Sequence, residues 1–321
     1  ERVGLMDFTG FSKYDISGPD AGTFLERICA NRLSTRENGV ALTHTLTENG
    51  RIFGEMTVTR LAEDRYYVLS AALAEIRDLD FFEKSLNEDE DVTISNVSES
   101  RGVLVVAGPL ARKLLTPLTD ASLENDHFQW LTAQEITLAG VPLRALRVKY
   151  MGELGWELHP EISDLEALYD AVWEVGQPLG AANIGLYAVN SLRIEKAYHG
   201  WGAELTNELN MLEAGMERFV RFEKEAFVGR EATLKAREDG LGWEMIYFEV
   251  DATDSDIRGA EPVFSGNQCV GVTTSGGYGH RCGKSLGFAT IRTGSTAPGD
   301  RLEVKLLGAR HALTLLVRRI G

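Results

Sequence analysis

Glu157 and Tyr150 are the residues whose chemistry stands out first, because they flank a turn that contains two glycines. Strand-forming residues occupy 143–150 and 156–159 on either side of that turn, so the segment predicts a tight β-hairpin. In such a hairpin a carboxylate and a phenol are held in fixed positions beside one another.

The direction of Glu157 follows from the alternation of side chains along a strand. If Trp156 and Leu158 face a core, Glu157 must face away from it. A rigid carboxylate can accept two parallel N–H bonds from a flat heterocycle with an amino group next to a ring N–H, as it does from a guanidinium. The alternative is a solvated glutamate on a sheet face, beside a tyrosine that fills the edge of a core.

Glu55 and Trp201 could also carry chemistry. Glu55 lies among apolar residues in a predicted strand, and such a half-buried carboxylate either pairs with a cation such as Arg193 or is held for catalysis. Trp201 stands between two glycines after the helix that carries Arg193, so it either stacks on a flat ligand or caps that helix against the core. His44 is explained as an ordinary core or surface histidine.

Several common chemistries lack their sequence marks. The chain has no Walker A loop, no HExxH, no GxSxG and no early GxGxxG followed by an acidic residue. A group of glycines near the C-terminus falls between two predicted strands with no helix after it, and it predicts a turn: Gly276, Gly277, Gly279 and Gly283. Histidines without ligand spacing and three cysteines without close CxxC spacing indicate neither a metal site nor a disulfide framework.

The composition limits the partners and the location. A net charge of −15 over 321 residues argues against nucleic acid or an anionic membrane as a partner, because both need a basic footprint. No apolar run approaches the ~20 residues that cross a bilayer. The cysteine usage indicates a reducing cytoplasm. The chain begins at Glu1 and enters a predicted strand within a few residues, so we expect an upstream region.

A strand, a Gly-Pro pair and an amphipathic helix occur in that order twice. The first copy has its strand at 13–17 and Gly18-Pro19, and the second has its strand at 103–106 and Gly108-Pro109. Proline suits the first turn of a helix, where its missing N–H would have no partner. The repeat predicts two related α+β halves.

The remaining elements follow from hydrophobic periodicity. A hairpin is expected from 51–61 and 66–70, and helices are expected at 73–86, 165–175, 186–198 and 227–237. From 245 onward short apolar runs bounded by Gly, Asn or Pro predict a small antiparallel β sandwich or barrel. The predicted domains are 1–46 with 140–237, then 47–139, and finally 241–321 after a charged linker.

Several motifs resemble the folate-dependent aminomethyltransferase family, which includes the glycine-cleavage T-protein. Within that family the chain looks most like the C-terminal folate domain of dimethylglycine and sarcosine dehydrogenases. The matching stretches run in family order along essentially the whole chain: VGLMD at 3–7, SGP at 17–19, ENGRI at 48–52, AGP at 107–109, YMGELGWE at 150–157, SLRIEKA at 191–197, WG at 201–202, FVGRE at 227–231 and TSG at 274–276.

The resemblance implies an α+β fold in which three domains form a ring around a central hole that holds tetrahydrofolate. Two of the domains would be α+β and the third an antiparallel β barrel or sandwich. Glu157 matches the carboxylate that reads the amino and N–H edge of the pterin, and Tyr150 matches a folate-contacting tyrosine. Trp201 falls where the T-protein has a tyrosine against the folate, and Phe11 is placed with these cofactor-binding residues.

Two positions depart from the T-protein pattern. Glu55 stands where the T-protein has its catalytic aspartate, and the extra methylene moves the carboxylate by about a bond length, a displacement that can cost catalysis heavily. Dehydrogenase-type relatives tend to carry glutamate here. Val189 replaces an arginine that binds the folate tail, so Arg193 is a candidate for that task.

The resemblance implies transfer of a one-carbon unit to tetrahydrofolate. The first reading takes the carbon from an N-methylated amine such as dimethylglycine or sarcosine, gives 5,10-methylenetetrahydrofolate, and needs a flavin domain or partner subunit for the oxidation. The second is a self-standing demethylase that moves a methyl group from a betaine, sulfonium or methyl ether to give 5-methyltetrahydrofolate. The third is a folate-binding module without catalysis.

Overall fold

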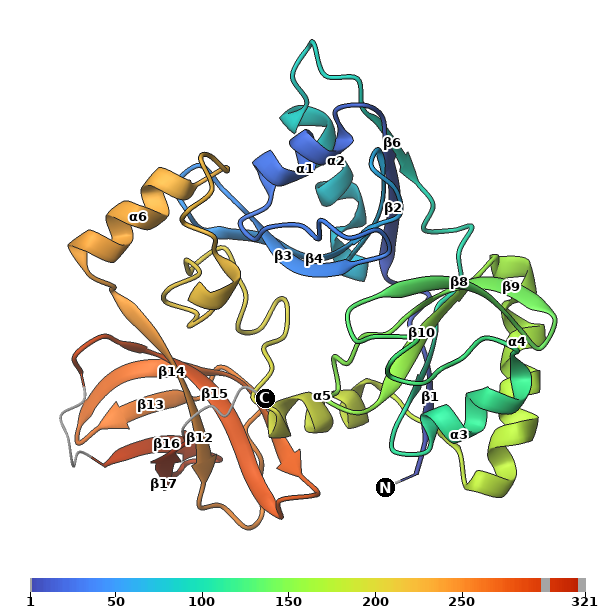
Figure 1. The fold of residues 1–321 in the computed structure, drawn as a ribbon. Coiled ribbons are helices and arrows are strands. Elements are labelled where there is room, and N and C mark those ends of the chain that lie inside the picture. Colours follow the sequence, from blue (N-terminus) through green and yellow to red (C-terminus); the bar gives the residue numbers. More distant parts are fainter. Residues whose placement is uncertain (1, 296–300, 317–321) are drawn as a thin grey trace. The chain divides into compact units, whose positions relative to one another are not determined.

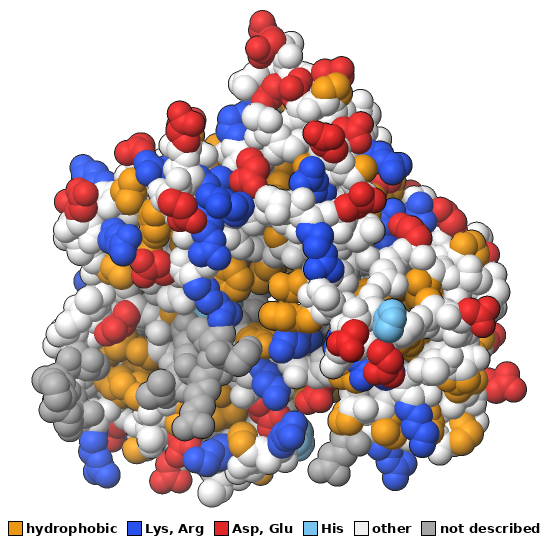
Figure 2. Space-filling model, in the orientation of Figure 1, with side chains coloured by type: hydrophobic (Ala, Val, Ile, Leu, Met, Phe, Trp, Pro, Cys, Tyr) orange, Lys and Arg blue, Asp and Glu red, His pale blue; other side chains and the backbone are white. Residues whose placement is uncertain are grey.

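The computed structural model describes residues 2–295 and 301–316, which group into two compact units (Figure 1). The first unit comprises 1–45, 54–185 and 223–228, and the second comprises 46–53, 186–222 and 229–321. Figure 2 shows acidic and basic side chains interspersed over the face in view, so the charge there is spread and not gathered in one patch.

A six-stranded sheet in the first unit positions Glu157. Its strand order is β11, β1, β7, β10, β9, β8, and only β1 and β11 run parallel. The strands are β1 (Gly4–Asp7), β7 (Leu104–Ala107), β8 (Ala133–Leu138), β9 (Val141–Leu146), β10 (Gly155–Pro160) and β11 (Ala182–Asn183). Helices α3 (Ala111–Leu115) and α4 (Leu165–Gly176) pack against each other, and α3 also contacts β10.

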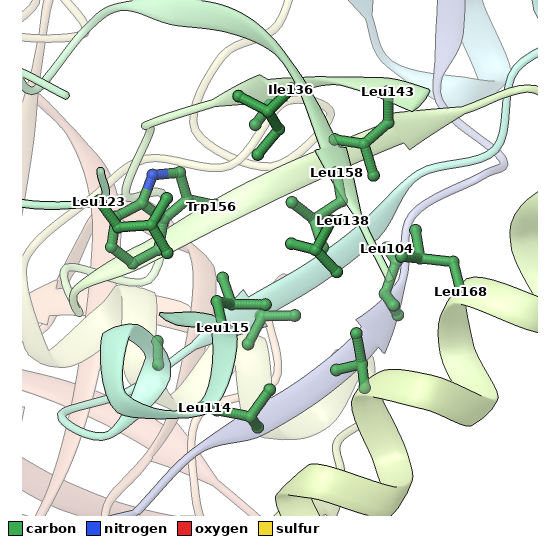
Figure 3. Packing of buried hydrophobic residues seen from close by; sticks show 14 of the residues in the cluster. Leu104, Leu114, Leu115, Leu123, Ile136, Leu138, Leu143, Trp156, Leu158 and Leu168 are labelled. Carbon is green, nitrogen blue, oxygen red and sulfur yellow. The ribbon is translucent and has the colours of Figure 1, made fainter. Parts of the chain in front are cut away.

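The core of this sheet explains the direction of β10. Trp156 and Leu158 are buried among leucines from the neighbouring strands and from α3 and α4 (Figure 3). Glu157 therefore lies on the opposite face, as the alternation of side chains predicted.

A five-stranded sheet positions Glu55. Its strand order is β3, β4, β5, β2, β6, and the expected hairpin is confirmed by the antiparallel pairing of β4 with β5. The elements are β2 (Ser12–Ser17), α1 (Ala21–Ile28), β3 (Val40–Leu46), β4 (Ile52–Arg60), β5 (Arg65–Ser70), α2 (Glu75–Ser85) and β6 (Thr93–Asn96). This order groups residues 12–46 with 52–96, unlike the expected division of the chain, and the domain boundaries themselves stay a prediction.

The repeated strand, Gly-Pro and helix unit is present at β2–α1 and at β7–α3. Gly18 and Gly108 have φ of +127° and +137°, and an added Cβ would lie 2.2 Å and 2.4 Å from a backbone oxygen. Both positions therefore require glycine. The prolines, however, precede the helices, which begin at Ala21 and Ala111. Each proline is the second residue of a β-turn in which the backbone N–H of the first helical residue donates to the glycine oxygen. This position suits the fixed φ of proline.

The helix predicted at 73–86 was expected to bury one stripe of apolar residues, namely Leu73, Ile76, Leu79, Phe82 and Leu86, and this was partly wrong. Helix α2 begins at Glu75 after a short 3₁₀ turn, and Leu73 and Ile76 are 101% and 85% exposed. Only Phe82 of the expected stripe is fully buried, against Tyr14 of β2. Leu79 and Phe81 are partly buried against the same core, so the helix packs through its middle and C-terminal part rather than along the whole expected stripe.

The second unit contains a closed six-stranded barrel, which confirms the expected C-terminal antiparallel β domain. The barrel consists of β12 (Trp243–Val250), β13 (Pro262–Ser265), β14 (Gln268–Gly279), β15 (Lys284–Arg292), β16 (Leu302–Leu306) and β17 (Ala309–Leu315). The same unit holds α5 (Leu186–Glu195), a 3₁₀ turn at Glu217–Phe219, and α6 (Arg230–Asp239). Both helices were expected near these positions.

The glycines predicted to form a turn lie mostly in a strand instead. Gly276, Gly277 and Gly279 belong to β14 and pair with β15, and only Gly283 is in the turn, with φ +69°. A Cβ at Gly276 would come 2.3 Å from Cβ of Ile257. Close packing over the strand, rather than a turn, requires glycine there.

Candidate functional site

Glu157 lies on β10, a strand that is paired with another strand on each side. It pairs with Val105 of β7 and with Leu146 of β9, and its side chain is 17% exposed. The connection between the two strands of the hairpin is longer than expected, because β9 ends at Leu146 and β10 begins at Gly155. The backbone of Glu157 is therefore rigid, and part of its carboxylate is open to a ligand.

The sequence had indicated that Tyr150 ends a strand. In the structure it lies in the eight-residue connection 147–154 between β9 and β10. The residue is 39% exposed. The structure nevertheless brings Tyr150 and Glu157 together, because both line one small cavity. The other walls are mostly apolar: Phe8, Val105, Ala107, Val148 and Met151, with Lys149 and Glu153 beside them.

Phe11 is not part of the wall of this cavity, but it contacts Phe8, which is. Its ring stacks on Phe8, with the centroids 4.9 Å apart and the planes inclined by 29°. The buried Lys13 donates from Nζ to the backbone oxygens of Thr9 and Phe11, at 2.7 Å each, and so holds this turn. Burial lowers the pKa of Lys13 to about 8, against the opposing charges of Glu75 and Asp7.

Two residues behind Glu157 were missed by the sequence reasoning. His159 shares the face of β10 with Glu157, and its Nε2 lies 3.4 Å from Glu157 Oε2. On its other side Nδ1 lies 3.1 Å from the hydroxyl of Tyr67, which belongs to β5. Both His159 and Tyr67 are 1% exposed. The spacing of two residues between Glu157 and His159 was the available signal, whereas nothing local pointed to Tyr67.

Glu55 is half-buried on β4, with its side chain 20% exposed. The imidazole of His44 on β3 lies beside it, with Nε2 3.3 Å from Glu55 Oε1, whereas Arg193 pairs with Glu204. His44 is completely buried, in agreement with a core histidine. A buried imidazole behind a carboxylate can orient it, and the carboxylate stays partly open to a ligand.

Arg193 and Trp201 belong to the second unit. Arg193 is 4% exposed, and its guanidinium donates to Glu204 Oε2 at 2.7 Å, to Ser275 Oγ at 2.9 Å, and to Asn190 Oδ1. These internal bonds favour a structural role, which ties α5 to β14, and the expected folate-tail contact stays a prediction. Trp201 is half-buried, and its backbone forms an isolated β-bridge with Leu205. Its expected stacking also stays a prediction.

Family models match nearly the whole chain. The GCVT N-terminal domain matches residues 1–224, and the glycine cleavage T-protein C-terminal barrel domain matches residues 244–319. An aminomethyltransferase of Thermoanaerobacter is 30% identical over 303 residues, which cover 94% of this chain and 82% of that protein.

Dimethylglycine dehydrogenases are also similar. The human mitochondrial protein is 36% identical over 318 residues, and the rat protein is 35% identical over the same length. The match covers 98% of this chain but only 37% of either relative. The chain thus spans little more than a third of these dehydrogenases.

A solved structure shares the fold. The glycine cleavage system aminomethyltransferase T from Bartonella henselae superposes with a TM-score of 0.88 and 23% identity, covering 100% of this chain and 86% of that one. Among the described residues, no helix is both long and apolar enough to span a bilayer.

Proposed function

This chain belongs to the GCVT family of glycine cleavage T-proteins, as its motifs indicated, and we propose that it transfers one-carbon units to tetrahydrofolate. The carbon comes from the methyl group of an N-methylated amine such as dimethylglycine or sarcosine. The products are 5,10-methylenetetrahydrofolate and the demethylated amine. The similarity to dimethylglycine dehydrogenases over 98% of the chain supports this class of donor.

The observation that carries the proposal is the placement of Glu157. Strand β10 fixes the backbone of Glu157, and the carboxylate is 17% exposed in a cavity that it shares with Tyr150. A pterin presents an amino group next to a ring N–H, and a carboxylate accepts such a pair of parallel donors. Apolar walls with a few placed polar groups are typical of cofactor sites. The carboxylate of Glu157, beside Tyr150, therefore offers the acceptors that the pterin edge of tetrahydrofolate needs, and tetrahydrofolate supplies the nitrogen that accepts the carbon.

Glu55 is proposed as the catalytic carboxylate. Its side chain is 20% exposed and is backed by the buried His44, so the carboxylate is held in one place in a partly dry environment. A fixed negative charge stabilises positive charge that develops on the one-carbon unit during transfer, and it costs no reorganisation at that moment. Glu55 would also hold the folate near N10.

Release of a formaldehyde-level carbon from an N-methyl group requires an oxidant. A flavin domain upstream of this chain, or a flavoprotein partner, would supply it, and the partial coverage of the dehydrogenases is consistent with such a division. An upstream reading frame with a flavin fingerprint of the GxGxxG type would support this arrangement.

A second candidate is a self-standing demethylase that gives 5-methyltetrahydrofolate from a betaine, sulfonium or methyl ether. The coverage of 82% of an aminomethyltransferase favours it, because that relative is matched over most of its own length. The two candidates are separated by incubating the chain with tetrahydrofolate and each class of donor, with and without an oxidant, and identifying the folate product by mass. Tight folate binding without any product would leave only a binding module.

A further inference from the structure

Glu157 is backed by two buried side chains from different sheets. His159 follows it by two residues on β10, so both side chains lie on the same face, away from Trp156. Tyr67 comes from β5 of the five-stranded sheet, and the rings of Tyr67 and His159 meet edge to face with centroids 5.6 Å apart. The order from the interior to the cavity is therefore Tyr67, His159 and Glu157.

The position of each proton in this series follows from which groups can donate a hydrogen bond and which can only accept one. An ionised carboxylate only accepts hydrogen bonds, so His159 Nε2, 3.4 Å from Glu157 Oε2, must carry the proton if it is to bond there. In a neutral imidazole Nδ1 then has a lone pair, and it accepts from the Tyr67 hydroxyl at 3.1 Å. The Tyr67 contact thus selects the tautomer that donates toward Glu157.

The surroundings keep the imidazole neutral. Burial lowers the pKa of His159, and the positive charges of Arg144 and Lys13 add to this effect, whereas Glu157 opposes it. Arg144 of β9 is opposite His159 of β10 in the register of the two strands. Its guanidinium lies 4.6 Å from the centre of the Tyr67 ring. Burial also raises the pKa of Tyr67, so its hydroxyl keeps the proton that it donates.

We propose that Tyr67 and His159 are a positioning pair that orients the Glu157 carboxylate for a ligand with two adjacent N–H donors. An imidazole N–H group 3.4 Å from Oε2 limits the rotation of the carboxylate, so less conformational freedom is lost when a ligand binds. This inference rests on the proposed function, because it assigns to Glu157 the amino and N–H edge of tetrahydrofolate. Neither Tyr67 nor His159 belongs to the wall of the cavity, so both would act through Glu157.

Tyr66 provides a matched control for Tyr67. The two tyrosines are neighbours on β5, are 5% and 1% exposed, and point to opposite faces of the strand. The Tyr66 hydroxyl donates to the backbone oxygen of Glu63 at 3.2 Å. Tyr66→Phe therefore removes a buried hydroxyl and one hydrogen bond, as Tyr67→Phe does, without touching His159.

The experiment combines tetrahydrofolate titration with a direct observation of the tautomer. In ligand-free protein labelled with ¹⁵N-histidine, the two-bond ¹H–¹⁵N correlations of His159 should show a proton on Nε2, with the signals assigned by their loss in His159→Gln. In Tyr67→Phe these signals should shift toward a tautomer mixture, and Kd for tetrahydrofolate should rise about threefold to tenfold. Tyr66→Phe should change neither quantity, and His159→Gln, which retains a donor, should bind more tightly than His159→Leu.

The outcomes separate the positioning role from the proposed function. If the wild-type chain does not bind tetrahydrofolate, or binds it unchanged after Glu157→Ala, the proposed function fails. If Glu157→Ala abolishes binding but Tyr67→Phe leaves Kd within twofold of wild type, only the positioning role fails. A proton on Nδ1 of His159 in the wild-type protein overturns the positioning pair whatever the affinities are.

Discussion

Replacing Glu157 by glutamine tests the proposed ligand contact with the least disturbance. The amide has nearly the size of the carboxylate, but it offers one acceptor and one donor group in place of two acceptors. One of the two parallel N–H donors of the pterin would then face an amide N–H. Loss of a hydrogen bond to a charged group costs about 1.5 to 3 kcal/mol, so Kd for tetrahydrofolate should rise by roughly 10-fold to 150-fold.

The folded state should tolerate this change. The amide oxygen can take the place of Oε2 beside His159 Nε2, which lies 3.4 Å from Oε2 in the wild-type protein. The backbone of β10 keeps its pairing with β7 and β9, because no core side chain is altered. We therefore expect the free energy of unfolding to change by less than about 1 kcal/mol.

The assay is calorimetric titration of tetrahydrofolate into wild-type, Glu157→Gln and Glu161→Gln proteins, with urea unfolding of each. Glu161 follows β10 directly, its side chain is 52% exposed, and it pairs with Arg101 at 2.9 Å. Glu161→Gln removes the same charge from the same region and should leave Kd within twofold of wild type. An unchanged Kd in Glu157→Gln would refute the assignment, and an equal loss in both variants would indicate a general effect of charge.

Three further results are expected. Glu55→Gln should lower the rate of product formation by about 100-fold or more in single-turnover assays, while Kd for tetrahydrofolate changes less than threefold; equal losses would indicate a binding role. Lys13 has a folded pKa of about 8 against an ordinary 10.5, so the unfolded chain binds more protons between these values and stability should rise with pH across that window. The rise should be roughly 3 kcal/mol at most and absent in Lys13→Met, as urea unfolding at several pH values would show, whereas a parallel rise in that variant would exclude Lys13 as the source. Arg193→Met should destabilise the fold by about 3 to 5 kcal/mol, because it leaves the buried Glu204 carboxylate without its cation; a melting temperature within a degree or two of wild type would contradict this.

The sequence determined those features that depend on neighbours along the chain. Alternation within a strand was enough to turn Glu157 away from Trp156, because successive side chains of any strand point to opposite faces. The Gly-Pro pairs marked two helix entries, because the backbone there adopts φ values that only glycine tolerates easily. The family was likewise evident from motifs, and the family models confirmed it; the C-terminal barrel was evident from short strands, and the structure confirmed it.

The tertiary structure decided which distant residues meet. Tyr67 approaches His159 only because β5 and β10, 92 residues apart at this contact, lie close together in the first unit. The same applies to Glu55, which lies beside His44 rather than Arg193, and to Arg193, which is enclosed by Glu204 and Ser275. Burial and pairing of charges depend on the whole packed environment, and local sequence patterns carry no information about groups that arrive from elsewhere in the chain.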